Sequence, residues 1–446
     1  MSNKLQPVRG THDILPDEFE KFNAVVTTAR ELATLYGFRE MATPIFEQTE
    51  VFSRSMGETS DVVSKEMFAF ETKGGESVTL RPEFTAGIAR AFISNGMQQH
   101  LPLKLFSTGP LFRYERPQKG RQRQFHQVNF EWLGDDSWMA DVEIITLAGQ
   151  LLYHISGKKG CTLLINTLGD IESRKIYREA LVSYLTPYKN ELSEDSKRRL
   201  AQNPLRILDS KDNGDRRILE NAPIITDCLG DEARDRFRRI CDVLQNKEVP
   251  FFQDMKIEPS LVRGLDYYTD TVFEFVANTG ELGAQNTILA GGRYDGLIEH
   301  MGGKPTPAIG FAAGVERLLL LHETRLDKNN DRKVIILPDD NISEGDVFWV
   351  AGIIRLELQN YNDNKIQKAK FSLEIYWQSS LKKRKEKAEK NGATHIITMS
   401  PNKHEEVTVR DMNARKDSIL SLKDCIKDGE VSTEFRENMK RIIGIV

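Results

Sequence analysis

The sequence predicts an α/β protein in which a large mixed domain is followed by a small strand–helix domain. The length of 446 residues allows roughly three domains at about 150 residues each. A stretch rich in mixed charge, at about 171–250, carries helical spacing and indicates an inserted, mostly helical domain. After a polar stretch that ends at residue 333, strand patterns alternate with helical ones, which is typical of a small α/β domain with a mainly parallel sheet.

The elements of the first domain can be followed in order along the chain. Apolar residues at helical spacing predict a helix at 17–36, and 78–81 reads as a short strand. Pro82 is expected at the first position of the next helix, with Glu83 in its first turn. Residues 103–132 predict a strand, a loop and a second strand. Apolar stretches punctuated by glycine at 261–320 predict further strands that close in a helix near 314–322.

The second domain follows a linker, which its polar composition places at 326–333. The expected organisation is therefore 1–325 for the first domain, with the helical insertion inside it, and 334–446 for the second. In the second domain we expect strands at 334–337, 372–377 and 395–399, with helices at 344–360 and 379–391 between them.

Composition excludes several classes of protein. The sequence has no apolar run of about 18 residues, so we expect no transmembrane helix. The first residues lack the apolar core of a signal peptide, and a cytoplasmic protein is expected. A net charge of −4 argues against a wholly basic protein that coats DNA, but it allows RNA binding through a local basic patch. The cysteines are scattered without a CxxC pair, so neither a disulfide framework nor a zinc site is predicted (Cys161, Cys228, Cys241 and Cys425).

The segment 125–132 carries the most informative polar pattern. Read as a strand, it places Phe125, Gln127, Asn129 and Glu131 on one face and an apolar set on the other. An ordinary half-buried strand with its polar face in water explains this pattern as well. If the strand pairs with the one before it, Arg113 can join the amide and the acid in one patch that suits a zwitterionic or phosphorylated ligand.

The loop that joins these two strands is basic. Four cations are opposed only by Glu115 (Arg116, Lys119, Arg121 and Arg123). Such a loop can hold phosphates or the end of a nucleic acid, although a solvated charged loop is a common alternative.

The segment GPLFRYERPQKGRQRQFHQVNFEW at 109–132 resembles the second signature motif of class II aminoacyl-tRNA synthetases, in the form found in histidyl-tRNA synthetases. PAIGFAAGVERL at 307–318 resembles their third motif, and LVRGLDYYTDTVFEF and AGGRYDGLI resemble two stretches peculiar to the histidine enzymes. RGTHDILPDE and TLRPEFTAGIAR also fit the family. The resemblance implies a class II catalytic domain built on an antiparallel sheet, and an anticodon-binding α/β domain at 334–446. Residues 399–417 depart from the pattern expected there.

The resemblance also implies a reaction in two steps. Histidine's carboxylate would attack the α-phosphate of ATP to give histidyl-adenylate, and the histidyl group would then pass to the 3′ end of its tRNA. Arg113 and Arg263 are the implied catalytic residues, one on each side of the α-phosphate. From the residues alone, Arg263 could instead form a structural ion pair with Asp266.

The remaining roles implied by the resemblance fall into three groups. The residues expected to bind histidine are Glu83, Thr85, Arg113, Gln127, Glu131, Arg263, Tyr267 and Tyr268. Those expected to bind ATP are Arg113, Glu115, Phe125 and Arg317. Those expected to contact the tRNA acceptor end are Arg116, Lys119, Arg121 and Arg123. Simpler structural roles remain open for three of these residues. Glu83 could be a partner of the helix dipole, Phe125 a core residue and Arg317 a surface residue.

The expected partners follow from the same resemblance. They are L-histidine, ATP with Mg²⁺, the histidine tRNA, and a second copy of the chain in a homodimer; no metal site built from protein side chains is predicted. The competing reading is the regulatory subunit of ATP phosphoribosyltransferase, a catalytically silent relative. Such a protein would be expected to lose the Arg263 region, the basic loop or the C-terminal domain, and all three are present.

Overall fold

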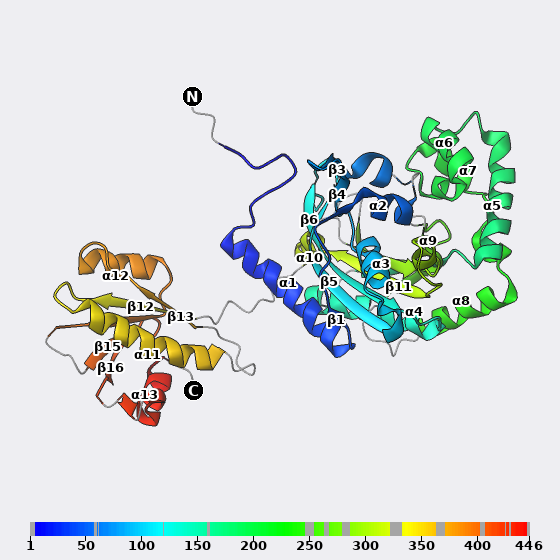
Figure 1. Ribbon diagram of the computed structural model, residues 1–446. Coiled ribbons are helices and arrows are strands. Elements are labelled where there is room, and N and C mark those ends of the chain that lie inside the picture. Colours follow the sequence, from blue (N-terminus) through cyan, green and yellow to red (C-terminus); the bar gives the residue numbers. More distant parts are fainter. Residues whose placement is uncertain are drawn as a thin grey trace. The chain divides into compact units, whose positions relative to one another are not determined.

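The computed structural model divides into two compact units, Met1–Glu323 and Thr324–Val446 (Figure 1). It describes residues 5–57, 60, 62–118, 120–157, 161–245, 254–262, 267–278, 286–321, 332–362, 371–401, 406–423, 425–427 and 430–443. The mixture of helices and strands in both units agrees with the α/β class that the sequence predicts. No described helix is both long enough and apolar enough to cross a bilayer.

The first unit is organised around an eight-stranded sheet in the order β1-β5-β6-β11-β10-β9-β7-β8. Neighbours from β5 to β7 pair antiparallel, whereas the two edge strands pair parallel. The strands are β1 (Arg39–Glu40), β5 (Leu103–Phe112), β6 (Gln124–Leu133), β7 (Cys161–Thr167), β8 (Asp254–Ile257), β9 (Thr269–Ala277), β10 (Thr287–Arg293) and β11 (Ala308–Gly314).

One face of this sheet is buried under helices. The helices are α1 (Pro16–Leu35), α4 (Trp138–Ser156), α8 (Asp231–Leu244) and α10 (Val315–Leu321), and they share one apolar cluster with the sheet. The rings of Phe130 on β6 and Phe311 on β11 stack within this region, with centroids 4.7 Å apart. Side chains alternate between the two faces of a strand. The residues between these buried ones therefore point to the opposite face of the sheet.

A smaller sheet and several short helices lie beside the main sheet. They are β2 (Phe46–Gln48), α2 (Thr49–Met56), a π-helical turn (Val62–Glu66), β3 (Phe68–Glu71), β4 (Ser77–Leu80), α3 (Thr85–Ser94), a 3₁₀ turn (Met97–His100) and α9 (Leu297–His300). Helix α3 begins at Thr85, so the prediction that Pro82 and Glu83 lie in its first turn is wrong. The carboxylate of Glu83 accepts hydrogen bonds from the backbone N–H groups of Thr85 (2.5 Å) and Ala86 (2.7 Å). A side chain that caps the helix in this way has to precede it.

Residues 171–244 form a group of helices between β7 and β8, here called the helical insertion. It comprises α5 (Ile171–Leu185), α6 (Glu194–Gln202), α7 (Asn213–Leu219) and α8, with 3₁₀ segments at Thr186–Tyr188, Pro204–Asp209 and Ile225–Cys228. Figure 1 shows these helices in green at one side of the first unit. Their own apolar cluster includes Tyr177 and Leu181, while α8 joins the core of the main sheet through Phe237 and Ile240.

A buried carboxylate fixes the loops of the helical insertion. The side chain of Asp215 is fully buried. It accepts hydrogen bonds from the backbone N–H of Ser193 and from the hydroxyls of Ser193, Ser196 and Ser210. Buried charge is costly unless it is hydrogen-bonded, and these donors offset that cost. The start of α6, the start of α7 and the end of the second 3₁₀ segment are thereby held together.

The second unit contains a five-stranded sheet in the order β13-β12-β14-β15-β16. Its elements are β12 (Arg332–Pro338), α11 (Glu344–Asn362), β13 (Phe371–Ile375), α12 (Leu381–Lys390), β14 (His395–Met399), β15 (Glu406–Asp411), β16 (Lys416–Ser421), β17 (Ile426–Lys427), β18 (Glu430–Val431) and α13 (Thr433–Ile443). The three strands and two helices expected here are confirmed within a few residues. Of the expected linker, residues 326–331 lie outside the described residues.

The sheet of the second unit is not mainly parallel as predicted. The pairs β12–β13 and β12–β14 are parallel, but β14–β15 and β15–β16 are antiparallel. A tight turn after β15 accounts for the β15–β16 pair: Asp411 accepts hydrogen bonds from the N–H groups of Asn413 (2.8 Å) and Ala414 (2.9 Å). An aspartate that bonds to the backbone two residues later is a common way to reverse a chain.

Candidate active site

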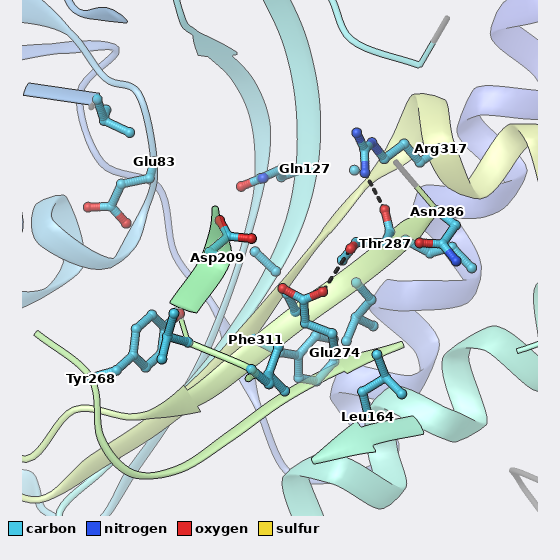
Figure 2. A pocket seen from close by; sticks show the side chains of 18 of the residues that line it. Glu83, Gln127, Leu164, Asp209, Tyr268, Glu274, Asn286, Thr287, Phe311 and Arg317 are labelled. Carbon is cyan, nitrogen blue, oxygen red and sulfur yellow. Dashed lines mark hydrogen bonds between the residues drawn. The ribbon is translucent and has the colours of Figure 1, made fainter. Parts of the chain in front are cut away.

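A cavity of about 850 Å³ opens on the first unit. Its lining comes from β6, β9, β10, β11, the segment before α3 and the 3₁₀ segment of the helical insertion that ends at Asp209. Figure 2 shows Glu83, Gln127 and Tyr268 together with Glu274 and Arg317 around this space. Residues distant in sequence, among them most of the predicted site residues, therefore meet in one cavity.

Strand β6 presents its polar face to the cavity, as the alternation of its residues predicts. Phe125, Gln127, Asn129 and Glu131 all line the cavity. The residues between them, Val128, Phe130 and Trp132, belong to the apolar core on the other side. His126 is the exception on that side: its backbone N–H donates to the carboxylate of Glu316 (2.9 Å), and its ring Nδ1 lies 2.9 Å from the same group. This contact fastens α10 to β6.

Glu131 is the most buried carboxylate of the cavity, with 1% of its surface exposed. It accepts hydrogen bonds from the Thr85 hydroxyl (2.5 Å), from the Asn129 amide (2.9 Å) and from the Tyr294 hydroxyl. Burial raises its pKa to about 7, although the three hydrogen bonds act in the opposite direction; the nearby charge of Glu83 raises it further. Glu131 is thus a firmly oriented acceptor whose ionisation lies close to neutral pH.

Gly310 makes room for this carboxylate. It pairs with Glu131 in the register of β11 and β6. A Cβ atom at position 310 would lie 1.8 Å from Oε2 of Glu131 and 2.4 Å from the carbonyl oxygen of Phe130. Any side chain at this position would displace the Glu131 carboxylate or the strand itself.

Glu83 and Thr85 lie next to this network. Glu83 is 5% exposed, and burial raises its pKa, while the N–H groups that it caps lower it. The structural role considered for Glu83, as a partner of a helix N-terminus, is therefore present in the geometry. The residue also lines the cavity, so capping and ligand contact can be made by the same side chain.

The opposite chemical character comes from arginines that line the cavity, among them Arg113, Arg121 and Arg317. Arg113 donates through Nε to the carbonyl oxygen of Pro82 (2.9 Å), and its guanidinium lies 5.5 Å from the Phe125 ring centroid. Arg317 donates to the carbonyl oxygens of Thr287 and Gly120. Burial lowers the pKa of Arg317 to about 10, and the positive charge of Arg121 lowers it as well. An anion bound here would relieve this repulsion.

The basic loop is more internally paired than its composition predicts. Arg121 donates to Glu115 (2.8 Å) and faces the cavity. The guanidinium of Arg123 lies 3.9 Å from the centroid of the Tyr114 ring. Arg116 is exposed, and Lys119 lies outside the described residues. Glu115 therefore neutralises part of the loop's charge next to the cavity.

Three tyrosines form one wall of the cavity. The rings of Tyr267 and Tyr268 lie 4.8 Å apart, and the rings of Tyr267 and Tyr294 lie 5.6 Å apart. Tyr268 and Tyr294 are buried. The predicted catalytic residue Arg263 immediately precedes this segment in sequence and lies outside the described residues, as does Asp266, its alternative ion-pair partner.

The structure adds cavity residues that the sequence analysis did not single out. Glu274 on β9 accepts a hydrogen bond from the Thr287 hydroxyl (2.7 Å), as Figure 2 shows. A lone acid within the apolar run TVFEFVA was a usable signal for it. Asp209 and Lys211 of the helical insertion also line the cavity. Nothing local in the sequence indicates that these two reach it.

The arrangement suits a ligand with both charges. The buried carboxylates of Glu83 and Glu131 and the half-buried amide oxygen of Gln127 can accept hydrogen bonds from the N–H groups of an amine or imidazole, and guanidinium groups match carboxylate and phosphate oxygens. Within the described ranges, no group of three or more His, Cys, Asp or Glu side chains is placed to hold a metal ion.

A family model for histidyl-tRNA synthetase matches residues 10–318. The chain belongs to the histidyl-tRNA synthetase family. Its relatives include proteins named histidine–tRNA ligase from two bacteria. The one from Rhodospirillum rubrum is 57% identical over 318 residues, covering 71% of this chain and 75% of the relative. The one from Gluconobacter oxydans is 45% identical over 422 residues, covering 94% and 97%.

Solved histidyl-tRNA synthetase structures support the same assignment. The apo histidyl-tRNA synthetase of Staphylococcus aureus is similar to this chain with a TM-score of 0.73 and 31% identity, covering 94% of this chain and 98% of that one. The class II synthetase fold implied by the resemblance is thereby confirmed. A Bacillus halodurans protein titled as an ATP phosphoribosyltransferase regulatory subunit/histidyl-tRNA synthetase is 20% identical, with a TM-score of 0.60. That likeness concerns the fold alone.

Proposed function

We propose that this protein is a histidine–tRNA ligase that activates L-histidine with ATP and transfers it to the 3′ end of its tRNA. The observation that carries this proposal is the cavity itself, in which the oriented Glu131 carboxylate and the tyrosine wall face the same space as Arg113 and Arg317. A substrate that combines an imidazole, an ammonium and a carboxylate, and that reacts with a triphosphate, needs this set of groups.

Recognition of histidine would rest on paired polar groups. Glu131 and Tyr268 would each bind one imidazole nitrogen, and Tyr267 lies beside them. Glu83, Thr85 and Gln127 would accept the hydrogen bonds of the ammonium, and Arg113 and Arg263 would bind the carboxylate. An analogue that lacks these donors leaves buried acceptors unpaired, and sites of this kind reject such analogues by factors of about 10⁴–10⁵.

Activation would rest mainly on positioning and charge. The histidine carboxylate attacks the α-phosphorus, the bond to pyrophosphate breaks, and negative charge is spread over oxygens that Arg113 and Arg263 would stabilise as catalytic residues. Arg317 would bind the γ-phosphate and stack on adenine, Phe125 would cover the other face of adenine, and Glu115 would lie near its amino group. The pairing of Arg121 with Glu115 orients that carboxylate at the edge of the cavity.

Mg²⁺ would enter with ATP, since it keeps several waters and binds through phosphates and one or two carboxylates. We propose Glu274 as an acid that would hold it, because Glu274 lines the cavity beside Thr287, which also contacts Arg317. Glu316 is less suited, because its oxygens accept hydrogen bonds from the His126 backbone. The ion would neutralise charge on the phosphates.

The contacts with tRNA divide between the two units. The exposed Arg116, with Lys119, Arg121 and Arg123 of the same loop, would meet the acceptor end, and the second unit, 334–446, would bind the anticodon. The expected homodimer and a cytoplasmic location belong to the same proposal. The alternative of a silent regulatory subunit is not favoured, because relatives named histidine–tRNA ligase share 45–57% identity with this chain.

The test is ATP–pyrophosphate exchange by the purified chain with single amino acids. Exchange should require histidine and should be absent with threonine, proline or glycine. A folded, monodisperse preparation that shows no histidine-dependent exchange would contradict the proposal. Charging of the histidine tRNA, followed by periodate protection of its 3′ end, then tests the transfer step separately.

A further inference from the structure

The backbone that carries Tyr267 and Tyr268 is hydrogen-bonded to the start of the helical insertion. Leu168, the residue after β7, donates through its N–H to the carbonyl oxygen of Asp270 (2.6 Å). The N–H of Asp270 donates to the carbonyl oxygen of Gly169 (3.2 Å). Arg174, in the second turn of α5, donates through Nη1 to the carbonyl oxygen of Tyr268 (2.9 Å). The segment 268–270 is therefore held by the two residues that lead into the insertion and by its first helix.

This attachment holds a strained conformation. Asp270 has a φ of +42°, in the left-handed region that a residue with a side chain adopts only at a cost of about 1–3 kcal/mol. Gly169, on the other side of the attachment, has a φ of +66°. A Cβ atom there would lie 2.7 Å from the Cβ of Ser173 and 2.9 Å from Leu229, so glycine is required. Such a conformation persists only where surrounding contacts hold it.

The start of α5, the helix that carries Arg174, is also linked to the last helix of the insertion. Asp170 caps α5 by accepting a hydrogen bond from the N–H of Ser173 (2.7 Å). The hydroxyl oxygen of Ser173 in turn accepts a hydrogen bond from the N–H of Gly230, the residue that precedes α8 (3.1 Å). The start of α5 is thus bound to the start of α8. A displacement of either helix has to move the Arg174 guanidinium relative to Tyr268.

We propose that Arg174 is a positioning residue through which the helical insertion sets the Tyr267–Tyr268 segment, and with it the affinity of the cavity for the amino acid. Arg174 acts through the Tyr268 carbonyl and is not among the residues that line the cavity. The proposal rests on the proposed function, because it takes the tyrosine wall as part of the histidine site. It gives the insertion a role in amino-acid binding that does not require tRNA.

The test compares Arg174→Gln with Arg178→Gln in ATP–pyrophosphate exchange. Arg178 lies one turn further along α5, is exposed, and offers a matched loss of one guanidinium. Arg174→Gln should raise the KM for histidine about tenfold, the lower end for one hydrogen bond from a charged group, with little change in the KM for ATP. Arg174→Lys keeps a cationic donor and should recover part of the loss. Arg178→Gln should behave as the unaltered protein.

Hydrogen exchange of the full chain supplies a second readout that does not depend on activity. Arg174→Gln should speed amide exchange at 268–270 but leave β5 and β6 unchanged. Equal rises in both KM values, no recovery by lysine, or unaltered exchange at 268–270 would each overturn the role of Arg174. Failure of the unaltered protein to exchange pyrophosphate with histidine would instead contradict the proposed function, and the amide exchange would still decide whether Arg174 holds the segment.

Discussion

Replacing Glu131 with glutamine tests whether its carboxylate is as strongly perturbed as its surroundings require. In the native protein the carboxylate has a pKa of about 7, against 4.5 when unperturbed. The native state therefore binds the proton more tightly than the unfolded state does. The contribution to stability is complete below about pH 4.5 and is lost progressively as the pH rises to about 7, beyond which the loss is constant.

The size of this loss follows from the difference in pKa. At about 1.4 kcal/mol for each pH unit, the full loss is about 3 kcal/mol, of which about 2 to 3 kcal/mol falls between pH 5 and 8. Glutamine has a similar shape and does not titrate. Its carbonyl oxygen can still accept from Thr85 and Asn129, and its amide can donate to the Tyr294 oxygen. We therefore expect Glu131→Gln to fold.

The assay is urea unfolding of both proteins at pH 5 and pH 8, followed by far-ultraviolet circular dichroism. The free energy of unfolding of the glutamine variant, relative to that of the unaltered protein, should be higher at pH 8 than at pH 5 by about 2 to 3 kcal/mol. Taking the difference between the two proteins cancels the titration of the groups that do not interact with Glu131. A difference that is the same at both pH values would refute the reasoning, because it would mean that Glu131 does not change its affinity for protons on folding.

Three further substitutions test other parts of the first unit, and a fourth, in the second unit, serves as a control. Gly310→Ala would place a methyl group 1.8 Å from Glu131 Oε2, so it should lower the free energy of unfolding by about 1–3 kcal/mol and abolish histidine-dependent exchange. The control is Gly352→Ala, in α11 with open space around it, which should leave the free energy of unfolding unchanged or raise it in the same assay. Arg317→Gln should raise the KM for ATP by about 10- to 100-fold with little effect on that for histidine, and equal changes in both would contradict its role. The two buried carboxylate oxygens of Asp215 together accept four hydrogen bonds, and Asp215→Asn replaces one of these oxygens with an amide donor; it should lower the free energy of unfolding by about 1–3 kcal/mol, and an unchanged urea midpoint would count against the account of the insertion loops.

The strands of the site could be predicted from the sequence because their geometry leaves few choices. Once 125–132 is a strand, the period of two decides which side chains share the face of Glu131, and the apolar alternate set decides which face is buried. The prediction for Glu83 was less accurate, since a helix boundary depends on which group satisfies the first N–H donors. Here the acid itself satisfies two of them, so the helix starts after it.

Contacts between distant segments could not be predicted from the sequence pattern. Arg121 belongs to a loop that composition describes as basic, yet its partner Glu115 and its place in the cavity depend on how the loop folds back. Asp209 reaches the cavity from a helical segment whose own sequence favours only local structure. The identity of the amino acid came from resemblance to known synthetases, because Tyr267 and Tyr268 have no pattern that distinguishes them from core aromatics.

Because of the contact between Gly310 and Glu131, positions 131 and 310 have to be changed together when the cavity is redesigned. Oε2 of Glu131 occupies the space in which a side chain at position 310 would begin. A library that varies either position alone will therefore contain mostly clashes or voids. To accept an amino acid with a different ring, a designer would shorten residue 131 and enlarge residue 310 in the same variant, so that the total volume across the two strands stays constant.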